Sequence, residues 1–425
     1  MKNYTIDTVT NVSQYVTNRP MLAETSAASI RRIYKSETRI DIALLVSALF
    51  LQRFSLQFGN TFLALDLVPV AFILLHQFLS GKLLIHYDRL LWFLALGLAT
   101  TGSLLMNFKS AKLTSYFLFL VLYSLMTLSR PSTLDQYKST LQIFQFLVML
   151  LSCIAIAQFT AQFVVDGARL IMFYGMIPDF LMAGSSGIHT IHPIEGIPSL
   201  LKSNAIFLAE PSTLSQITAL GILIEILEFR RPRYMFAMVL GFLLAYSGTG
   251  LMTLLLFLPL AGFRHGKVAL SALLVVVFAL GLFATGIIDS SVFLSRSTEF
   301  ENSHTSGFAR FVAPLALAAE LFDTGSVQAL VVGTGPGTGS NINSWLRPLY
   351  EYGIIGSFVV VCFWASCLRG SRCPGPVLAA LFFTYLFEAG FLDPSILTLI
   401  AVLCTLHGPE PRSGRVDQLA IAELR

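Results

Sequence analysis

Long apolar runs recur along this chain, and they limit its fold more than any other feature. Each needs roughly 20 apolar residues to cross a bilayer as a helix, although several here are shorter. The candidate runs cover residues 40–58, 61–79, 90–107, 113–129, 141–164, 206–228, 234–247, 250–263, 268–288, 350–368, 375–391 and 394–406. Lipid offers no hydrogen-bond partners to the backbone, so only helices or a closed barrel can span it. Because the runs are continuous rather than alternating, they predict helices and exclude a barrel.

The charge content supports the same fold class. Only 12% of the 425 residues are charged and 55% are hydrophobic, whereas a soluble domain carries about 25% charged residues. We therefore expect an all-α, polytopic membrane protein with about twelve spans. The expected organisation is a tail over residues 1–39, a membrane domain over 40–407 and a second tail over 408–425. The net charge of +4 comes from small basic groups beside the runs, so nucleic acid is not an expected partner.

The distribution of basic residues predicts the orientation. Most of the 28 Lys and Arg residues fall on one side when the runs alternate across a membrane, and that side is the cytoplasm. Both tails are then cytoplasmic. Two outer loops are long, at about 165–205 and 289–349. Long loops in a compact protein are usually functional or disordered, and apolar clusters within these two argue against disorder.

Arginines in these outer loops are the first candidates for substrate binding. The positive-inside tendency makes outer arginines less expected, and a guanidinium presents a planar set of donors that suits phosphate. The residues concerned are Arg169, Arg296, Arg310 and Arg347.

Three residues are candidates for proton transfer. Glu210 stands at the outer end of a predicted span, where an ionisable group is costly and is a functional candidate by default. His304 lies in the second long loop and could accept a proton near neutral pH. Glu351 follows as the third candidate base. The sequence holds no Asp-x-Asp pair and no Cys-x-x-Cys zinc pattern, so no metal site is expected.

Residues 333–339 form a glycine-rich run, Gly-Thr-Gly-Pro-Gly-Thr-Gly, called the glycine loop below. It lacks the Lys-Ser/Thr ending of a nucleotide-binding loop. Gly335 and Gly337 are interpreted as a tight backbone passage that offers N–H donors to an anion; a plain turn is the alternative. Asn343 follows shortly after the loop.

At three places the chain resembles the O-antigen polymerase and ligase superfamily, especially Wzy-type polysaccharide polymerases. Glu210-Pro211-Ser212 is similar to the Glu-Pro-Ser that follows the first long outer loop in exopolysaccharide members. Ser247-Gly248-Thr249-Gly250 resembles their Ser-x-Thr-Gly element. The glycine loop, Asn343 and the Glu-Tyr-Gly-Ile-Ile-Gly of residues 351–356 are similar to their terminal signature. The spacing from Arg296 to Gly307 also fits their Arg-x10-Gly pattern.

The resemblance implies a GT-C-like, metal-independent glycosyltransferase without a cofactor. It would transfer a growing glycan from polyprenyl (undecaprenyl) diphosphate onto a lipid-linked repeat unit at the outer face of the bacterial inner membrane. The two long outer loops would then be periplasmic. Arg296 and Arg310, with Arg169 or Arg347, would bind the diphosphate. Membrane lipids surround such an enzyme, and a chain-length regulator and a flippase of the same pathway are further candidate partners.

Two alternatives remain open from the sequence. An O-antigen ligase, which transfers glycan to lipid A–core, shares the architecture, but many ligases carry His where this chain has Ile342. A secondary transporter would also have about twelve spans, often with paired repeats and ionisable residues at the midplane. No repeat is detected here, and the polar residues gather in outer loops.

Overall fold

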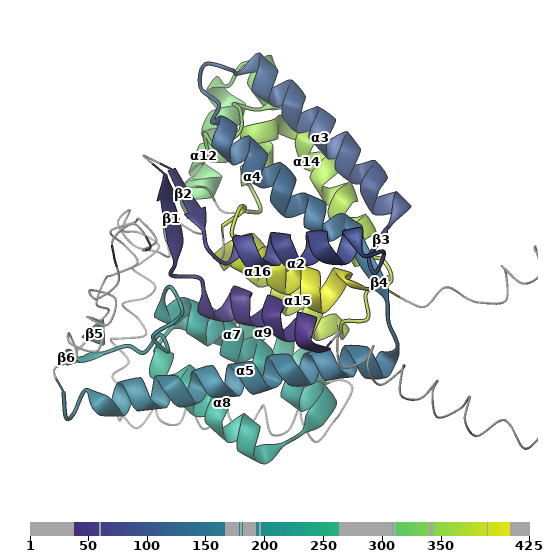
Figure 1. Cartoon of the computed structure of the whole chain (residues 1–425). Helices are drawn as coiled ribbons and strands as arrows, with labels where there is room; N and C mark the ends of the chain where they lie inside the picture. The colour runs from purple at the N-terminus through teal and green to yellow at the C-terminus, as the bar shows by residue number, and fades with distance from the viewer. Residues whose placement is uncertain are drawn as a thin grey trace, which may run out of the picture.

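The computed structural model describes residues 38–58, 61–165, 178, 181, 193–194, 197–262, 308, 312–339, 342, 344–388 and 390–408. This part of the chain is mostly helical, as the apolar runs predict (Figure 1). A helix over 38–50 comes first. The further helices are α2 (Leu67–Leu79), α3 (Tyr87–Met106), α4 (Leu113–Ser124), α5 (Leu134–Ala161), α7 (Pro211–Ile224), α8 (Pro232–Ala245), α9 (Gly248–Gly262), α12 (Ala313–Thr324), α13 (Val327–Val332), α14 (Arg347–Leu368), α15 (Gly375–Phe383) and α16 (Pro394–Ile400).

Short helical turns of other pitch and short strands complete the described fold. The turns are η1 (Leu125–Thr127), η4 (Glu225–Phe229), η6 (Thr384–Glu388) and η7 (Ala401–Thr405). The strands are β1 (Ser55–Phe58), β2 (Thr61–Ala64), β3 (Leu84–Ile85), β4 (Leu128–Pro131), β5 (Pro193–Ile194), β6 (Ile197–Leu201) and β7 (His407–Gly408).

Four helices in the described residues are long and apolar enough to cross a membrane. They are Tyr87–Met106, Leu134–Ala161, Pro211–Phe229 and Arg347–Leu368. Several other apolar helices, such as α2 and α8, are shorter. The predicted span 268–288 and much of both predicted long loops lie outside the described residues. The membrane fold class is therefore confirmed in outline, and a total of about twelve spans stays a prediction.

The first two predicted spans differ from the structure in one respect. The first helix ends at residue 50, and β1 and β2 form an antiparallel hairpin in which Ser55 pairs with Ala64 and Phe58 with Thr61. Two runs of extended residues separated by Gly59-Asn60 are typical of a hairpin with a two-residue turn. The apolar content of this stretch concealed that signal.

Close helix packing forms the core, and small residues allow it. An added Cβ on Gly221 of α7 would lie 2.7 Å from Met238 Sδ of α8 and 2.9 Å from Val148 Cγ1 of α5. Gly241 of α8 approaches Ser152 of α5 in the same way. Such close contacts matter in a membrane because lipid tails are as apolar as the helix surfaces. The hydrophobic effect then contributes little to helix association, and van der Waals packing contributes more.

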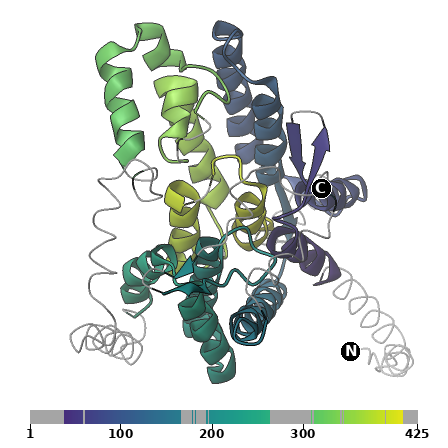
Figure 2. The same cartoon turned by 90° about the vertical axis from the view of Figure 1, so that its left-hand side faces the viewer.

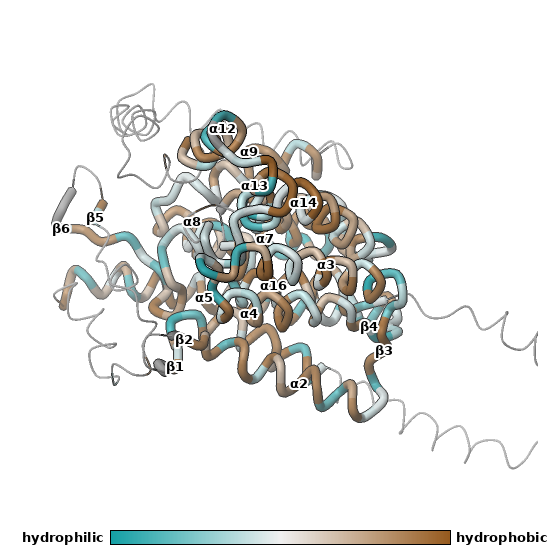
Figure 3. The backbone as a smooth tube through the Cα atoms, turned by 90° about the horizontal axis from the view of Figure 1, so that it is seen from above, coloured by the Kyte–Doolittle hydropathy of each residue, from teal (hydrophilic) through white to brown (hydrophobic). Residues whose placement is uncertain are grey.

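The helices form two groups with α15 and α16 between them (Figures 1 and 2). One group contains α5, α7, α8 and α9, and the other contains α3, α4 and α12 to α14. Buried aromatic rings from α4, α14 and the connection before α16 stack together at the second group's inner side, including Phe119, Tyr123, Phe363 and Phe391. Large apolar side chains on α3 instead face outward, among them Leu91 and Leu98, and most of α2 is coloured as hydrophobic in Figure 3.

Both ends of the described chain meet at one end of the molecule. β4 pairs with β3 and, in parallel, with β7. Arg130 of β4 forms a buried ion pair with Asp41 of the first helix at 2.5 Å. The hairpins β1–β2 and β5–β6 lie at the opposite end (Figure 1). The described chain therefore starts and ends at the same end of the molecule, and an even number of crossings stays a prediction.

Candidate functional site

Glu210 lies at the start of α7, at the end of the molecule that carries the β1–β2 hairpin. It is the N-cap residue, with extended backbone, and Pro211 occupies the first helical turn, where its missing N–H costs nothing. The guanidinium of buried Arg53 holds the preceding backbone: Nε donates to Leu208 O at 2.7 Å and Nη2 to Ala209 O at 3.1 Å. The backbone at Glu210 is thus held from both sides, by the start of α7 and by the hydrogen bonds from Arg53.

The structure brings the Glu-Pro-Ser and Ser-x-Thr-Gly motifs together. Ser212 Oγ donates to Glu210 Oε2 at 2.8 Å. One turn further along α7, Ser215 Oγ accepts from the Gly250 amide at 3.2 Å and lies 3.2 Å from Thr249 Oγ1. An added Cβ on Gly250 would lie 2.4 Å from Ser215 O, so α9 can start against α7 only because this residue is glycine. The two motifs form one hydroxyl-rich junction beside Glu210.

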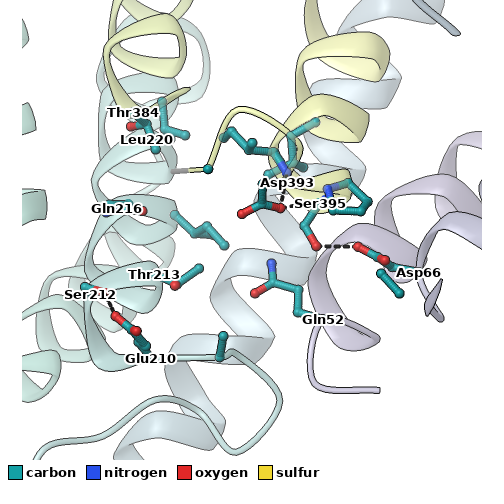
Figure 4. A pocket seen from close by; sticks show the side chains of 17 residues that line it. Gln52, Asp66, Glu210, Ser212, Thr213, Gln216, Leu220, Thr384, Asp393 and Ser395 are labelled. Carbon is teal, nitrogen blue, oxygen red and sulfur yellow. Dashed lines mark hydrogen bonds between the residues drawn. The ribbon is translucent and has the colours of Figure 1, made fainter. Parts of the chain in front are cut away.

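A cavity of about 300 Å³ opens next to Glu210 (Figure 4). Its walls come from the N-terminal half of α7, the start of α16, η6 and the residues around β2. The polar lining residues are Gln52, Asp66, Glu210, Ser212, Thr213, Gln216, Thr384, Asp393 and Ser395. Lys, Arg and His are absent from the described lining residues.

Two further carboxylates are linked across this cavity by Ser395. The Ser395 amide donates to Asp393 Oδ1 at 2.9 Å, and its hydroxyl donates to Asp66 Oδ2. Asp393 caps α16 and Asp66 directly precedes α2, so both lie before their helices.

Sequence reasoning singled out neither Asp66 nor Asp393. Asp66 stands inside the predicted span 61–79 and Asp393 directly before the predicted span 394–406. An acidic residue in such a place is a functional candidate by default, and the same rule had identified Glu210. That signal was available and would have placed all three in the candidate set.

The third motif lies in the other helix group, where the glycine loop packs against a break in α14. Gly353 interrupts this helix with φ 65° and ψ −168°. Beside the break, Tyr350 O accepts from the Thr334 amide at 2.9 Å, and Glu351 O accepts from the Gly335 amide at 3.1 Å. Gly335 and Gly337 also have positive φ and pack against the connection between α3 and α4. The loop is a tight backbone passage in which the amides of Gly333, Thr334, Gly335 and Thr338 donate to carbonyls of this chain. Binding of an anion by the loop stays a prediction.

Arg347 and Glu351 pair with each other below the glycine loop. Arg347 Nε donates to Glu351 Oε1 at 2.7 Å, and the Gly339 amide donates to the same oxygen at 3.1 Å. The side chain of Glu351 is fully buried, and that of Arg347 is 8% exposed. This geometry is typical of a pair that holds the loop on the helix, and it places both charges away from open solvent.

The two clusters meet at the segment before α16. The Arg347 guanidinium lies 5.7 Å from the Phe391 ring centroid, and Phe391 directly follows Gly390, which lines the cavity. The Trp345 amide donates to Leu386 O of η6 at 3.1 Å. All three motifs therefore border the same central part of the fold.

The remaining predicted site residues cannot be placed in this way. Arg169, Arg296, His304, Arg310 and Asn343 lie outside the described residues. Within the part of the chain that is described, no group of three or more His, Cys, Asp or Glu side chains is arranged to hold a metal ion.

Comparison with known proteins identifies one family. The family model described as WcaD colanic acid polymerase matches residues 41–407, which is most of the chain and nearly the whole of the predicted membrane domain. A search of curated proteins found no match.

Proposed function

The chain belongs to the WcaD colanic acid polymerase family, and from this premise we propose that it extends an exopolysaccharide on a lipid carrier at the outer face of the inner membrane. The family itself makes the chain a membrane-embedded exopolysaccharide polymerase, acting on a lipid-linked oligosaccharide as a glycosyltransferase-like enzyme. The single observation that carries the finer proposal is the cavity beside Glu210, at the end of the molecule predicted to face outward.

In the proposed reaction the donor is a growing glycan on polyprenyl diphosphate. A hydroxyl of the lipid-linked acceptor attacks the anomeric carbon of the donor's first sugar, forming the new glycosidic bond. The bond from that carbon to the phosphate oxygen breaks, and polyprenyl diphosphate leaves with the electron pair. The hydroxyl proton passes to a carboxylate, as general base catalysis requires.

Glu210 is our candidate for that base. It is only partly buried and lines the cavity, so an acceptor hydroxyl can approach its carboxylate. Glu351 fits the role less well, because it is fully buried and paired with Arg347. His304 stays an alternative base in the second predicted outer loop.

The leaving diphosphate needs positive charge near the bond that breaks. Preorganised donors stabilise developing negative charge strongly in a site of reduced dielectric. We assign this role to Arg296 and Arg310, with Arg169. Arg347 is a weaker candidate than in the sequence prediction, because its Nε is bound to Glu351.

Replacing Glu210 by glutamine tests the proposal. In a deletion strain complemented with Glu210→Gln, we expect polymer to fall by at least a hundredfold, the usual contribution of a positioned base, while lipid-linked single repeat units accumulate. Arg296→Ala in the same strain is expected to abolish polymer with the protein still in the membrane. Glu228→Gln, at an exposed position on η4, is the matched control and should leave polymer unchanged.

Two outcomes would contradict this assignment. Normal chain lengths from Glu210→Gln would remove Glu210 as the base. Long chains that stay on the lipid carrier in the deletion strain would indicate a ligase instead of a polymerase.

A further inference from the structure

We infer that the cavity beside Glu210 is the subsite for the acceptor's terminal sugar, and that it takes an uncharged sugar ring rather than an acidic sugar or the diphosphate. This inference rests on the proposed function, because the proposed reaction is what makes the bound sugar an acceptor. Its arguments come from the size of the cavity, the charge of its walls and the polar groups that it leaves unpaired.

The size of the cavity suits the end of a glycan. About 300 Å³ lies at the lower end of the roughly 300–1,000 Å³ range of small-molecule sites. The whole lipid-linked oligosaccharide does not fit in such a volume. The donor's diphosphate and polyprenyl chain must therefore lie elsewhere, which agrees with arginines on separate loops as their binding groups.

The charge of the walls selects against anions. Asp66, Glu210 and Asp393 line the cavity, and its described lining holds no cationic side chain. Arg53 lies behind the wall, where it binds the carbonyls of Leu208 and Ala209. An anion between the carboxylates of Asp66 and Asp393 meets repulsion that the partly buried setting strengthens. A uronic acid or a diphosphate is disfavoured, whereas neutral hydroxyls can donate to each carboxylate.

The walls also carry polar groups without a protein partner. Asp66 Oδ1 and Thr384 Oγ1 are buried and have no hydrogen-bond partner among the described residues. The Gln216 side chain lines the cavity from α7, on the same side as Glu210 and Thr384 (Figure 4), and it has no hydrogen bond to another described residue. Buried polar groups are nearly always satisfied by some partner, and a ring with several hydroxyls supplies both donors and acceptors at short spacing.

Ligand binding to the full chain in lipid nanodiscs tests the inference without turnover. The probes are methyl glycosides of glucose, galactose and mannose, methyl glucuronoside and inorganic pyrophosphate, followed by saturation-transfer NMR. We expect a signal from at least one neutral glycoside, none from the glucuronoside, and no displacement of the neutral glycoside by pyrophosphate. The Asp66→Asn/Asp393→Asn variant should gain a glucuronoside signal; asparagine can still cap α16.

Gln216→Leu locates the binding. Because the Gln216 side chain has no hydrogen bond to another described residue, this change should leave the fold intact, which size-exclusion of the purified variant checks. Neutral-glycoside binding should weaken about tenfold, the effect of losing one hydrogen bond in a buried site. Glu228→Gln is again the control. In cells, the Gln216→Leu strain should accumulate lipid-linked single repeat units.

The inference is overturned by any of three results. They are glucuronoside binding as strong as that of the neutral glycosides in the wild type, displacement by pyrophosphate, and unchanged neutral binding in Gln216→Leu. Failure of the proposed function gives a different result from failure of this inference. It would appear as normal polymer in the strain that carries Glu210→Gln. Normal polymer in Gln216→Leu, with Glu210→Gln inactive, would remove the acceptor role alone.

Discussion

At the scale of single residues, the Arg347–Glu351 pair shows how a structure changes the reading of a motif. Both residues belong to the stretch that most resembles the terminal signature of the polymerase superfamily, and both were predicted to act on substrate. In the structure they are buried and bind each other at 2.7 Å. Glu351 also accepts the Gly339 amide. A role in holding the glycine loop explains these contacts without a substrate.

Removing one member of this pair should destabilise the protein strongly. Arg347→Gln or Glu351→Gln leaves one buried charge unpaired, which costs about 3–5 kcal/mol. The double variant removes both charges and should recover most of the loss, together with polymer synthesis. Thermal unfolding in detergent, followed by fluorescence size-exclusion, measures the first effect, and polymer from a complemented strain measures the second. Single variants as stable as the wild type would contradict a structural role, and a stable but inactive double variant would return Arg347 or Glu351 to the active site.

At the scale of elements, the break in α14 is the feature that joins the glycine loop to the helices. In a continuous helix, the carbonyls of Tyr350 and Glu351 would accept hydrogen bonds from amides one turn further along α14. Here they accept from the amides of Thr334 and Gly335 in the glycine loop instead. Ser103 Oγ of α3 also donates to Glu351 O at 2.7 Å. The break thus lets one short stretch bind the loop and α3 at once. Broken helices of this kind occur in membrane proteins where protein groups satisfy the freed backbone.

Gly353→Ala should disrupt this arrangement. The backbone at φ 65° and ψ −168° costs about 1–3 kcal/mol for a residue with a side chain, and the added Cβ would lie 2.4 Å from Val331 C and O. We expect lower thermal stability and less polymer. Gly102→Ala in α3 is the control: nothing lies within 4 Å of its added Cβ, and it should stabilise the helix by about 0.5–1 kcal/mol. Equal thermal midpoints for the two variants would show that the break tolerates a side chain.

At the scale of the whole molecule, the two ends differ in chemistry. One end gathers the described chain ends around β3, β4 and β7, where Arg130 binds Asp41 and Arg89 donates to Thr405 O at 2.8 Å. The opposite end carries Glu210 and the cavity. The positive-inside tendency predicts that the first end is cytoplasmic, which would place the cavity on the side where the predicted arginine-bearing loops lie.

Substituted cysteines test this orientation. In a background with the five native cysteines replaced, Ser186→Cys and Ser297→Cys should react with a membrane-impermeable maleimide added to cells with a permeabilised outer membrane. Ser36→Cys and Ser413→Cys should react only after the inner membrane is broken. The physical reason is that the reagent cannot cross the bilayer. The reverse pattern would place the proposed reaction on the wrong side of the membrane.

The sequence by itself determined the membrane class and the family motifs, because apolar length and charge bias are local properties that the bilayer imposes on each segment. It also identified Glu210 by the cost of a charge near an apolar run. It did not reveal the β1–β2 hairpin, whose alternation was hidden by its apolar content, or that Asp66 and Asp393 line the same cavity as Glu210 although they come from distant parts of the chain. Only the tertiary structure decided which charges pair internally, as Arg347 and Glu351 do, and which face a cavity, because helix packing sets both burial and partners.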